Sequence, residues 1–204
     1  MFTLWFMGRP ASGKSTIASR VQDKLVENEY AVENLDGDDI RKNLHPDLGF
    51  SREDRRTNNR RTAYVAQLLN RNNISTIVGM ITPFRDSQQQ AREIVDAEGE
   101  FVLVYVKCSL EEAEARDPKN LYEQARRGNI EKFTGVNHPF EEPLNPEIIV
   151  DTEEMSPEEA VEHVFTRLEE LDVLSVPLDE EYDFTITREE EQDVIERLDR
   201  LGHI

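Results

Sequence analysis

The chain has a single cysteine and no long apolar run among its 204 residues. Because Cys108 is alone, an internal disulfide is excluded. Its place at the end of the apolar run Phe101–Cys108 predicts a buried core residue rather than a nucleophile. No stretch approaches the roughly 20 apolar residues that cross a bilayer, so we expect no membrane partner. The first predicted strand follows Met1 directly, so we expect no signal peptide and, by default, a cytoplasmic location.

Positive charge is scarce, with 24 basic against 43 acidic residues and a formal net charge of −19. Residues 141–204 hold 22 acidic and four basic residues, whereas residues 1–140 hold 21 acidic and 20 basic residues. Half of the basic residues fall in two segments, Arg41–Arg61 and Arg116–Lys132. Two basic clusters on a nearly neutral body predict a small polyanionic substrate. The negative charge of the whole chain opposes nucleic acid, which we do not expect as a partner.

Apolar runs that predict strands alternate with amphipathic patterns that predict helices. This alternation is typical of a parallel sheet covered by helices on both faces. We therefore expect an α/β domain over residues 1–172, with three layers (α/β/α) and a mainly parallel five-stranded sheet. The predicted strands are Thr3–Met7, Ala31–Leu35, Ile74–Ile81, Phe101–Cys108 and Glu147–Val150. The predicted helices are Lys14–Val26, Ser51–Leu69, Arg85–Val95, Ser109–Ala115, Lys119–Arg127 and Ser156–Leu171.

Residues 173–204 differ in character and are expected to form an acidic C-terminal extension. Alternating apolar residues predict one strand, and Thr187 with Glu190 predicts the start of a helix with an apolar stripe. Such a stripe must be buried, either on its own domain or on a partner subunit. The strand residues are Tyr182, Phe184 and Ile186, and the stripe residues are Val194, Ile195, Leu198 and Leu201.

The most specific motif is Gly8–Ser15, which has the pattern G-x-x-x-x-G-K-[ST] between a predicted strand and a predicted helix. Backbone N–H groups of such a loop bind the β-phosphate of a nucleotide. Lys14 reaches the β- and γ-phosphate oxygens, and the Ser15 hydroxyl binds Mg²⁺. The motif predicts a P-loop NTPase fold with Mg²⁺ and ATP as ligands. The predicted ATP-binding residues are Gly8, Arg9, Pro10, Ala11, Ser12, Gly13, Lys14, Ser15 and Thr16.

An acidic turn, Asp36–Asp39, follows the second predicted strand. Ligands lie at the carboxyl ends of parallel strands, so these carboxylates are expected to face the phosphate loop. A P-loop kinase needs a carboxylate near Mg²⁺ and a group that orients or deprotonates the acceptor hydroxyl. Asp36 is the first candidate for the acceptor role and Asp38 the second, an order that the sequence leaves open. The predicted catalytic residues are Lys14, Asp36 and Asp38, and the predicted metal ligands are Ser15 and Asp36.

Two arginines, Arg41 and Arg55, follow the acidic turn in the first basic segment. Guanidinium groups make bidentate contacts to phosphate or sulfate, so these two residues predict a clamp for an oxyanion. Residues 128–146 contain prolines and show no periodicity, which is typical of a functional loop or lid.

Several blocks of the sequence resemble the adenylylsulfate (APS) kinase family, in that family's order and spacing, over about residues 2–165. The blocks are Gly8–Thr16, Leu35–Asp38, Asp47–Ser51, Arg116–Tyr122, Phe133–Val136 and Asn145–Glu147. The resemblance implies transfer of the γ-phosphoryl group of MgATP to the 3′-hydroxyl of APS, which gives PAPS and ADP. It also implies a homodimer, and the acidic extension suggests association with an ATP sulfurylase.

The resemblance assigns roles to individual residues. Phe50 and Phe133 match the aromatic residues that sandwich the adenine of APS, Ile81 matches a backbone contact to substrate, and Arg116 lies near the ATP purine. Lys119 lies in a mobile lid over the substrates. The substrate-binding residues implied in this way are Asp38, Arg41, Phe50, Arg55, Asn58, Ile81, Thr82, Lys119, Lys132 and Phe133.

Three departures from the family pattern leave alternatives open. Asp39 replaces the usual Asn, Thr82 replaces a Ser that some accounts treat as a phosphorylated intermediate, and Arg9–Ala11 replaces Leu-Ser-Gly. Asp39 and Thr82 allow a kinase of the same chemistry with a different nucleotide acceptor. The acidic extension allows a nucleotide-binding partner module without catalysis. Direct in-line transfer needs no phosphorylated residue.

Overall fold

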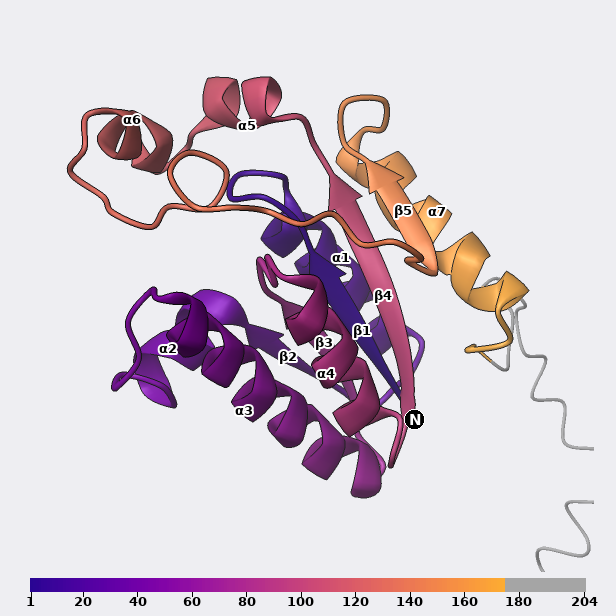
Figure 1. The fold of residues 1–204 in the computed structure, drawn as a ribbon. Coiled ribbons are helices and arrows are strands. Elements are labelled where there is room, and N and C mark those ends of the chain that lie inside the picture. The colour runs from indigo at the N-terminus through magenta and orange to yellow at the C-terminus, as the bar shows by residue number, and fades with distance from the viewer. Residues whose placement is uncertain (175–204) are drawn as a thin grey trace, which may run out of the picture.

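The computed structural model describes residues 1–174 and contains five parallel strands in one sheet (Figure 1). The strand order is β2-β3-β1-β4-β5, so β1 is central and pairs with β3 on one side and β4 on the other. The predicted strand and helix of the C-terminal extension lie outside the described residues. The strands are β1 (Phe2–Met7), β2 (Val32–Asp36), β3 (Ser75–Gly79), β4 (Glu100–Lys107) and β5 (Ile148–Asp151).

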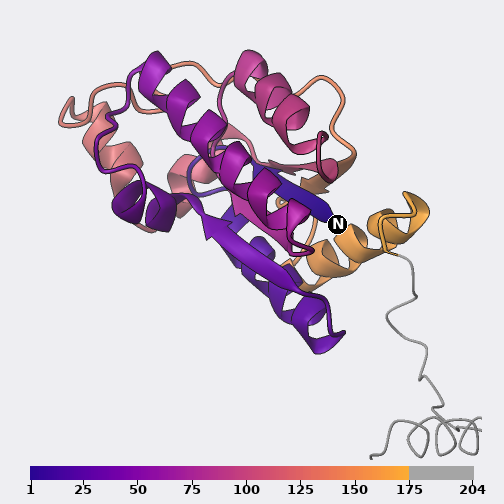
Figure 2. The same ribbon diagram turned by 90° about the horizontal axis from the view of Figure 1, so that it is seen from below.

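Four helices cover the two faces of this sheet. Figure 2 shows α3 and α4 on one side and α1 and α7 on the other. Side chains alternate along a strand, so Leu4 and Phe6 of β1 join the core under α1 and α7, while Trp5 and Met7 join the core under α3 and α4. The helices are α1 (Lys14–Glu27), α3 (Arg52–Arg71), α4 (Arg85–Val95) and α7 (Pro157–Glu170).

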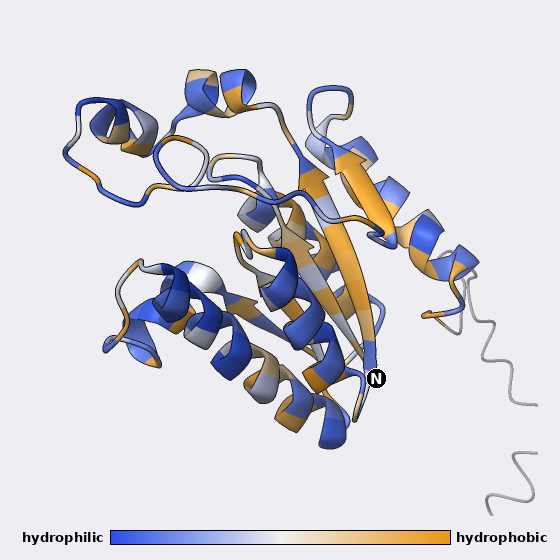
Figure 3. Ribbon diagram, in the orientation of Figure 1, coloured by the Kyte–Doolittle hydropathy of each residue, from blue (hydrophilic) through white to orange (hydrophobic). Residues whose placement is uncertain are grey.

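Hydropathy follows this layered arrangement (Figure 3). The central strands are apolar along their length because both faces are covered, and β1 is buried at all six positions. The covering helices are polar on the outside, as expected for helices that bury one stripe. The sheet therefore forms a rigid platform, and functional residues gather where its strands end.

Three short helices lie beyond the carboxyl ends of the strands: α2 (Gly37–Asn43), α5 (Leu110–Arg116) and α6 (Leu121–Arg126). Beneath α5 and α6, a separate small cluster includes Cys108, Tyr122 and Phe133. Cys108 is buried there, as the sequence predicted. The predicted three-layer fold and all five strands are confirmed, each strand with bounds shifted by one or two residues. The helix α2 was not predicted. Among the described residues, no helix combines the length and hydropathy needed to cross a membrane.

Candidate active site

The phosphate loop connects β1 to α1 and depends on two glycines. A Cβ on Gly8 would lie 2.4 Å from the carbonyl oxygen of Val106 on β4, so no larger residue fits where the loop passes the sheet. Gly13, with φ of 95°, precedes the first residue of α1. Ala11 also has a left-handed conformation, with φ of 60°, which L-residues other than glycine seldom adopt. The loop is thus a fixed, strained turn at the N-terminus of a helix, a geometry that favours anions.

Lys14 is the first residue of α1 and is only 9% exposed. Its Nζ donates a 2.6 Å hydrogen bond to the carbonyl oxygen of Arg9 and lies 3.4 Å from the hydroxyl of Ser12. Burial lowers the pKa of Lys14 to about 8, although Asp36 and Asp38 oppose this shift. An ammonium group so poorly solvated gains strongly from a nearby anion.

Ser15, at the start of α1, meets Asp36, at the carboxyl end of β2. The Ser15 hydroxyl donates to Oδ2 of Asp36 at 3.1 Å, although the two residues are 21 positions apart. Asp36 is also the N-cap of α2, where its Oδ1 accepts a 2.9 Å hydrogen bond from the backbone N–H of Asp38. The Asp36 carboxylate is therefore fixed by two hydrogen bonds beside the phosphate loop.

The oxygens of the Ser15 hydroxyl and the Asp36 carboxylate are suitable ligands for Mg²⁺. The ion prefers hard oxygen ligands and is commonly bound by one or two protein groups together with water and substrate phosphates. The described residues contain no cluster of three or more His, Cys, Asp or Glu side chains that would form an all-protein metal cage. Ser15 and Asp36 thus suit a cation that arrives with a nucleotide.

Two side chains of the α5–α6 segment reach across to other elements. Lys119 forms a 2.7 Å ion pair with Asp38, and the side chains of both residues are exposed. Arg116 donates to the hydroxyl and carbonyl oxygens of Thr152 at 3.0 and 2.7 Å. Thr152 follows β5 and is the nearest side chain to Gly13 of the phosphate loop, so Arg116 lies beside the start of α1.

Arg41 and Arg55 both lie close to the ring of Phe50. The guanidinium carbons lie 4.6 and 5.6 Å from the centre of the Phe50 ring, which is 54% exposed. Arg41 donates to the carbonyl oxygen of Gly49 at 2.7 Å, and Arg55 donates to that of Phe50 at 3.2 Å. Within residues 1–174, neither arginine forms an ion pair.

Removing these two guanidinium groups from water costs free energy because each loses solvation. Arg55 is 7% exposed, and burial, with a smaller contribution from Arg41, lowers its pKa to about 10. Burial likewise lowers the pKa of Arg41. Two neighbouring guanidinium groups that bond only to neutral carbonyl oxygens are poised to bind an anion.

Phe133 is placed differently from Phe50. Its ring is 8% exposed and packs edge-to-face against Tyr122, with centroids 4.9 Å apart. The structure does not show the Phe50 and Phe133 rings stacked on each other. The two segments are nevertheless joined, because Arg55 also donates a 2.8 Å hydrogen bond to the carbonyl oxygen of Lys132, whose own side chain is exposed.

Asn58 is held by a residue that the sequence did not single out. Its side chain is 2% exposed, and its Oδ1 lies 2.8 Å from Nδ1 of His45. Because Oδ1 can only accept, His45 must donate from Nδ1, which leaves the Asn58 amide N–H groups for another partner. A histidine in a loop gives no sequence signal for this contact, so only the structure reveals it.

The segment after β3 contains Ile81 and Thr82. Ile81 is partly exposed, whereas Thr82 is buried and its hydroxyl accepts a hydrogen bond from the indole of Trp5. The backbone at Thr82 is left-handed. These residues follow the carboxyl end of β3, next to the strand that leads into the phosphate loop.

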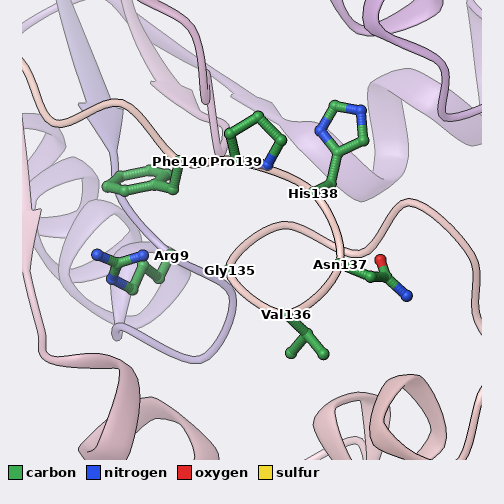
Figure 4. Close-up of a pocket in the computed structure, with 7 residues that line it drawn as sticks. All are labelled: Arg9, Gly135, Val136, Asn137, His138, Pro139 and Phe140. Carbon is green, nitrogen blue, oxygen red and sulfur yellow. The ribbon is translucent and has the colours of Figure 1, made fainter.

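Arg9 points away from Lys14, toward the segment after Phe133. Its guanidinium stacks on Phe140 at 4.6 Å and forms a 3.4 Å ion pair with Glu142. A cavity of about 440 Å³ lies between Arg9 and this segment (Figure 4). The other residues that line the cavity are Gly135, Val136, Asn137, His138, Pro139 and Phe140.

Comparison with known proteins identifies the family to which a chain with this phosphate loop, acidic turn and pair of arginines belongs. The profile of the Adenylylsulphate kinase family matches residues 1–151. This chain belongs to the adenylylsulfate kinase family. As a member of it, the chain is an ATP-dependent phosphotransferase, and the resemblance noted in the sequence is confirmed.

Individual relatives agree with this assignment. The chain is 48% identical to a probable adenylyl-sulfate kinase of Halalkalibacterium halodurans over 165 residues, 81% of each protein. It is 45% identical to the adenylyl-sulfate kinase of Halothermothrix orenii, over 87% of this chain and 94% of that protein. Among solved structures, the Mycobacterium tuberculosis APS kinase in complex with AMPPNP and APS is 39% identical, with a TM-score of 0.79 over 82% of this chain and 96% of that one.

Proposed function

We propose that this chain transfers the γ-phosphoryl group of MgATP to the 3′-hydroxyl of APS, giving PAPS and ADP. The observation that carries the proposal is the geometry at the carboxyl edge of the sheet. The phosphate loop supplies a buried ammonium, and its serine pairs with the Asp36 carboxylate. On α2 and α3, a half-buried and a buried guanidinium group, without ion-pair partners in the described chain, suit a second anionic nucleotide.

At the donor end, the phosphate loop binds ATP through the backbone N–H groups of Gly8–Thr16. Lys14 exchanges its bond to the Arg9 carbonyl oxygen for the β- and γ-phosphate oxygens and neutralises the charge that develops during transfer. Ser15 and Asp36 would hold Mg²⁺, which would screen the phosphate charges. We assign Arg116 to the ATP purine, and its hydrogen bond to Thr152 near the start of α1 supports this role.

At the acceptor end, Arg41 and Arg55 bind the phosphosulfate, and Phe50 offers a face for the adenine, since stacking on an aromatic ring contributes about 1–3 kcal/mol per base. Asn58 presents its amide to the ribose. Phe133 provides the second aromatic ring for the adenine. The backbone at Ile81 and Thr82 and the side chains of Asp38, Lys119 and Lys132 complete this set.

The transfer step is a direct in-line displacement. The 3′-oxygen of APS bonds to the γ-phosphorus while the bond from that phosphorus to the β–γ bridging oxygen breaks, and ADP leaves. Asp36, whose carboxylate is oriented by its two hydrogen bonds, is the first candidate to orient the 3′-hydroxyl or to accept its proton. Asp38 is the second candidate for this role because Lys119 occupies its carboxylate in this structure.

The direct test is to mix the purified chain with MgATP and APS and detect PAPS by mass spectrometry. We expect Lys14→Ala to lower turnover by at least about 100-fold, since it removes charge stabilisation of the transition state. The matched control is Lys24→Ala on the same helix, where the lysine pairs with Glu162 at 2.9 Å on the far side from the site. Turnover by Lys14→Ala equal to that of the control would exclude the assigned role.

A panel of nucleotide acceptors then tests the substrate itself. We expect APS to have the highest kcat/KM, and a better acceptor would replace it in this proposal. Tight binding of ATP and APS with no PAPS formed would instead support a non-catalytic binding module.

We further propose that the chain forms a homodimer, and that an ATP sulfurylase is a candidate partner. Sedimentation velocity at several concentrations measures the first, and co-sedimentation with a purified ATP sulfurylase measures the second. A monomer at all concentrations would reject the homodimer.

A further inference from the structure

The single tryptophan of the chain bonds directly to the loop proposed to contact the acceptor. Trp5 lies on the central strand β1 and is fully buried. Its indole Nε1–H donates a 2.8 Å hydrogen bond to Oγ1 of Thr82, 77 residues later in the chain. A buried indole N–H needs a partner, and this hydroxyl is its only one in the described residues.

Thr82 has a backbone conformation that a β-branched residue seldom adopts. Its φ is 42°, in the left-handed region, and the residue is 1% exposed. Strain of this kind persists only where the surroundings hold it, and it occurs most often at functional sites. Here the side chain is held by Trp5, and the carbonyl oxygen accepts a 3.3 Å hydrogen bond from the amide of Gln88 on α4.

The loop on either side of Thr82 is also fixed. The backbone N–H of Met80 donates to the carbonyl oxygen of Phe6 at 3.0 Å, and the carbonyl oxygen of Pro83 accepts from Glu141 at 2.8 Å. Ile81 is left between these anchors as the partly exposed residue. The strand that leads into the phosphate loop therefore also sets the conformation at Ile81 and Thr82.

We propose that Trp5 is a positioning residue for the acceptor: its indole N–H fixes Thr82 in the left-handed conformation, which orients the backbone at Ile81 toward APS. This inference rests on the proposed function for its acceptor site. The same inference gives the Thr82 hydroxyl a structural role, because its oxygen is buried and already accepts a hydrogen bond. The phosphoryl group then passes directly from ATP to APS, with no phosphorylated Thr82 on the way.

Steady-state kinetics separate this role from general stability. We expect Trp5→Phe and Thr82→Val each to raise the KM for APS about tenfold, with kcat and the KM for ATP changed less than about threefold. The double variant should have the same KM for APS as either single variant, because both substitutions remove the same hydrogen bond. Thr82→Ser keeps the hydroxyl and should restore the KM. Phe165→Leu, in the core on the opposite face of the sheet, should lower stability without changing the KM for APS.

A second readout needs no turnover. With one tryptophan, the ¹⁵N-labelled protein gives one indole N–H cross-peak. We expect this peak to move in Thr82→Val, to return close to its native position in Thr82→Ser, and to shift on addition of APS more than on addition of a non-hydrolysable ATP analogue.

The outcomes distinguish the inference from the proposed function. If the wild-type chain forms PAPS and Trp5→Phe leaves the KM for APS unchanged, the positioning role is wrong and the function stands. If APS neither reacts nor shifts the indole peak, the proposed acceptor is wrong as well. Loss of kcat by more than 100-fold in Thr82→Val, together with phosphate on Thr82 in the intact wild-type protein, would overturn the structural role and favour a phosphorylated intermediate.

Discussion

At the residue scale, the site is built from buried polar side chains that are each hydrogen-bonded to defined partners. Lys14, Arg55, Asn58 and Thr82 are all less than 10% exposed. Burying such groups is costly unless each is hydrogen-bonded, so their partners matter as much as the residues themselves. Those partners are backbone carbonyl oxygens for the two cations, His45 for the amide and Trp5 for the hydroxyl.

His138 provides a pH-dependent prediction at this scale. Burial, then Arg55, Lys132 and Arg52, lower the pKa of His138 below its ordinary value of 6.5, and its ring lies edge-on to Phe84. The unfolded chain therefore binds more protons than the folded chain just below pH 6.5, so the stability contributed by neutral His138 is lost as the pH falls through this range. We expect the stability of wild type relative to His138→Gln to decrease from pH 7 to pH 5, measured by urea unfolding. Parallel profiles for the two proteins would contradict the lowered pKa.

At the element scale, helix starts set the positions of the acceptor residues. Asp36 begins α2, which carries Arg41, and Ser51 begins α3, which carries Arg55 and Asn58. Ser51 and Asp54 form a capping box, with the hydroxyl and carboxylate each accepting a backbone N–H at 3.1 Å. Since Phe50 immediately precedes this cap, the cap fixes both the helix and the aromatic residue before it.

Two serine-capped helices test this arrangement. The capping box of Ser156 and Glu159 begins α7, which follows β5 at the opposite side of the sheet from β2. We expect Ser51→Ala and Ser156→Ala each to lower the free energy of unfolding by about 1 kcal/mol, through loss of one capping hydrogen bond. Only Ser51→Ala should also raise the KM for APS, by several-fold. Chemical denaturation measures the free energy of unfolding of both variants, and steady-state kinetics measures their KM for APS. An equal KM for APS in the two variants would show that the α3 cap does not position the site.

At the scale of the whole molecule, the strand order brings three distant segments to one edge of the sheet. The phosphate loop follows β1, α2 follows β2 and the loop containing Thr82 follows β3, and these strands are neighbours. The α5–α6 segment, after β4, reaches back to α2 through the ion pair of Lys119 with Asp38. Closure of such a segment over bound substrates excludes water and protects ATP from hydrolysis.

Replacing Lys119 should separate activity from stability. Exposed ion pairs contribute little, so we expect Lys119→Met to change the free energy of unfolding by less than about 0.5 kcal/mol. Turnover should fall about tenfold or more if Lys119 contacts the bound substrates as we propose. Arg20→Gln, which removes the exposed pair of Arg20 with Glu158 between α1 and α7, is the control and should leave both properties unchanged. Equal turnover in the two variants would place Lys119 outside the site.

The sequence predicted more of the fold than of the site's internal contacts. The strands were recognisable because each is a short apolar run, and the helices because their apolar residues recur at helical spacing. The seven-residue α2 is too short and too polar to show that spacing. The stacking of Phe133 on the adenine stays a prediction, whereas its edge-to-face contact with Tyr122 was not predicted, since nothing in a linear motif specifies which neighbour a ring contacts.

The sequence by itself determined the α/β class, the position of the phosphate loop and the family resemblance, because these depend on local spacing and on the order of elements. The domain boundary near residue 172, the acidic extension and the cytoplasmic location stay predictions. Only the tertiary structure decided that His45 holds Asn58, that Lys119 reaches Asp38, and that Trp5 holds Thr82. The contact of His45 with Asn58 depends on how α3 folds back beside the end of α2. The other two contacts join residues 81 and 77 positions apart, which meet because parallel strands bring their carboxyl ends to one edge.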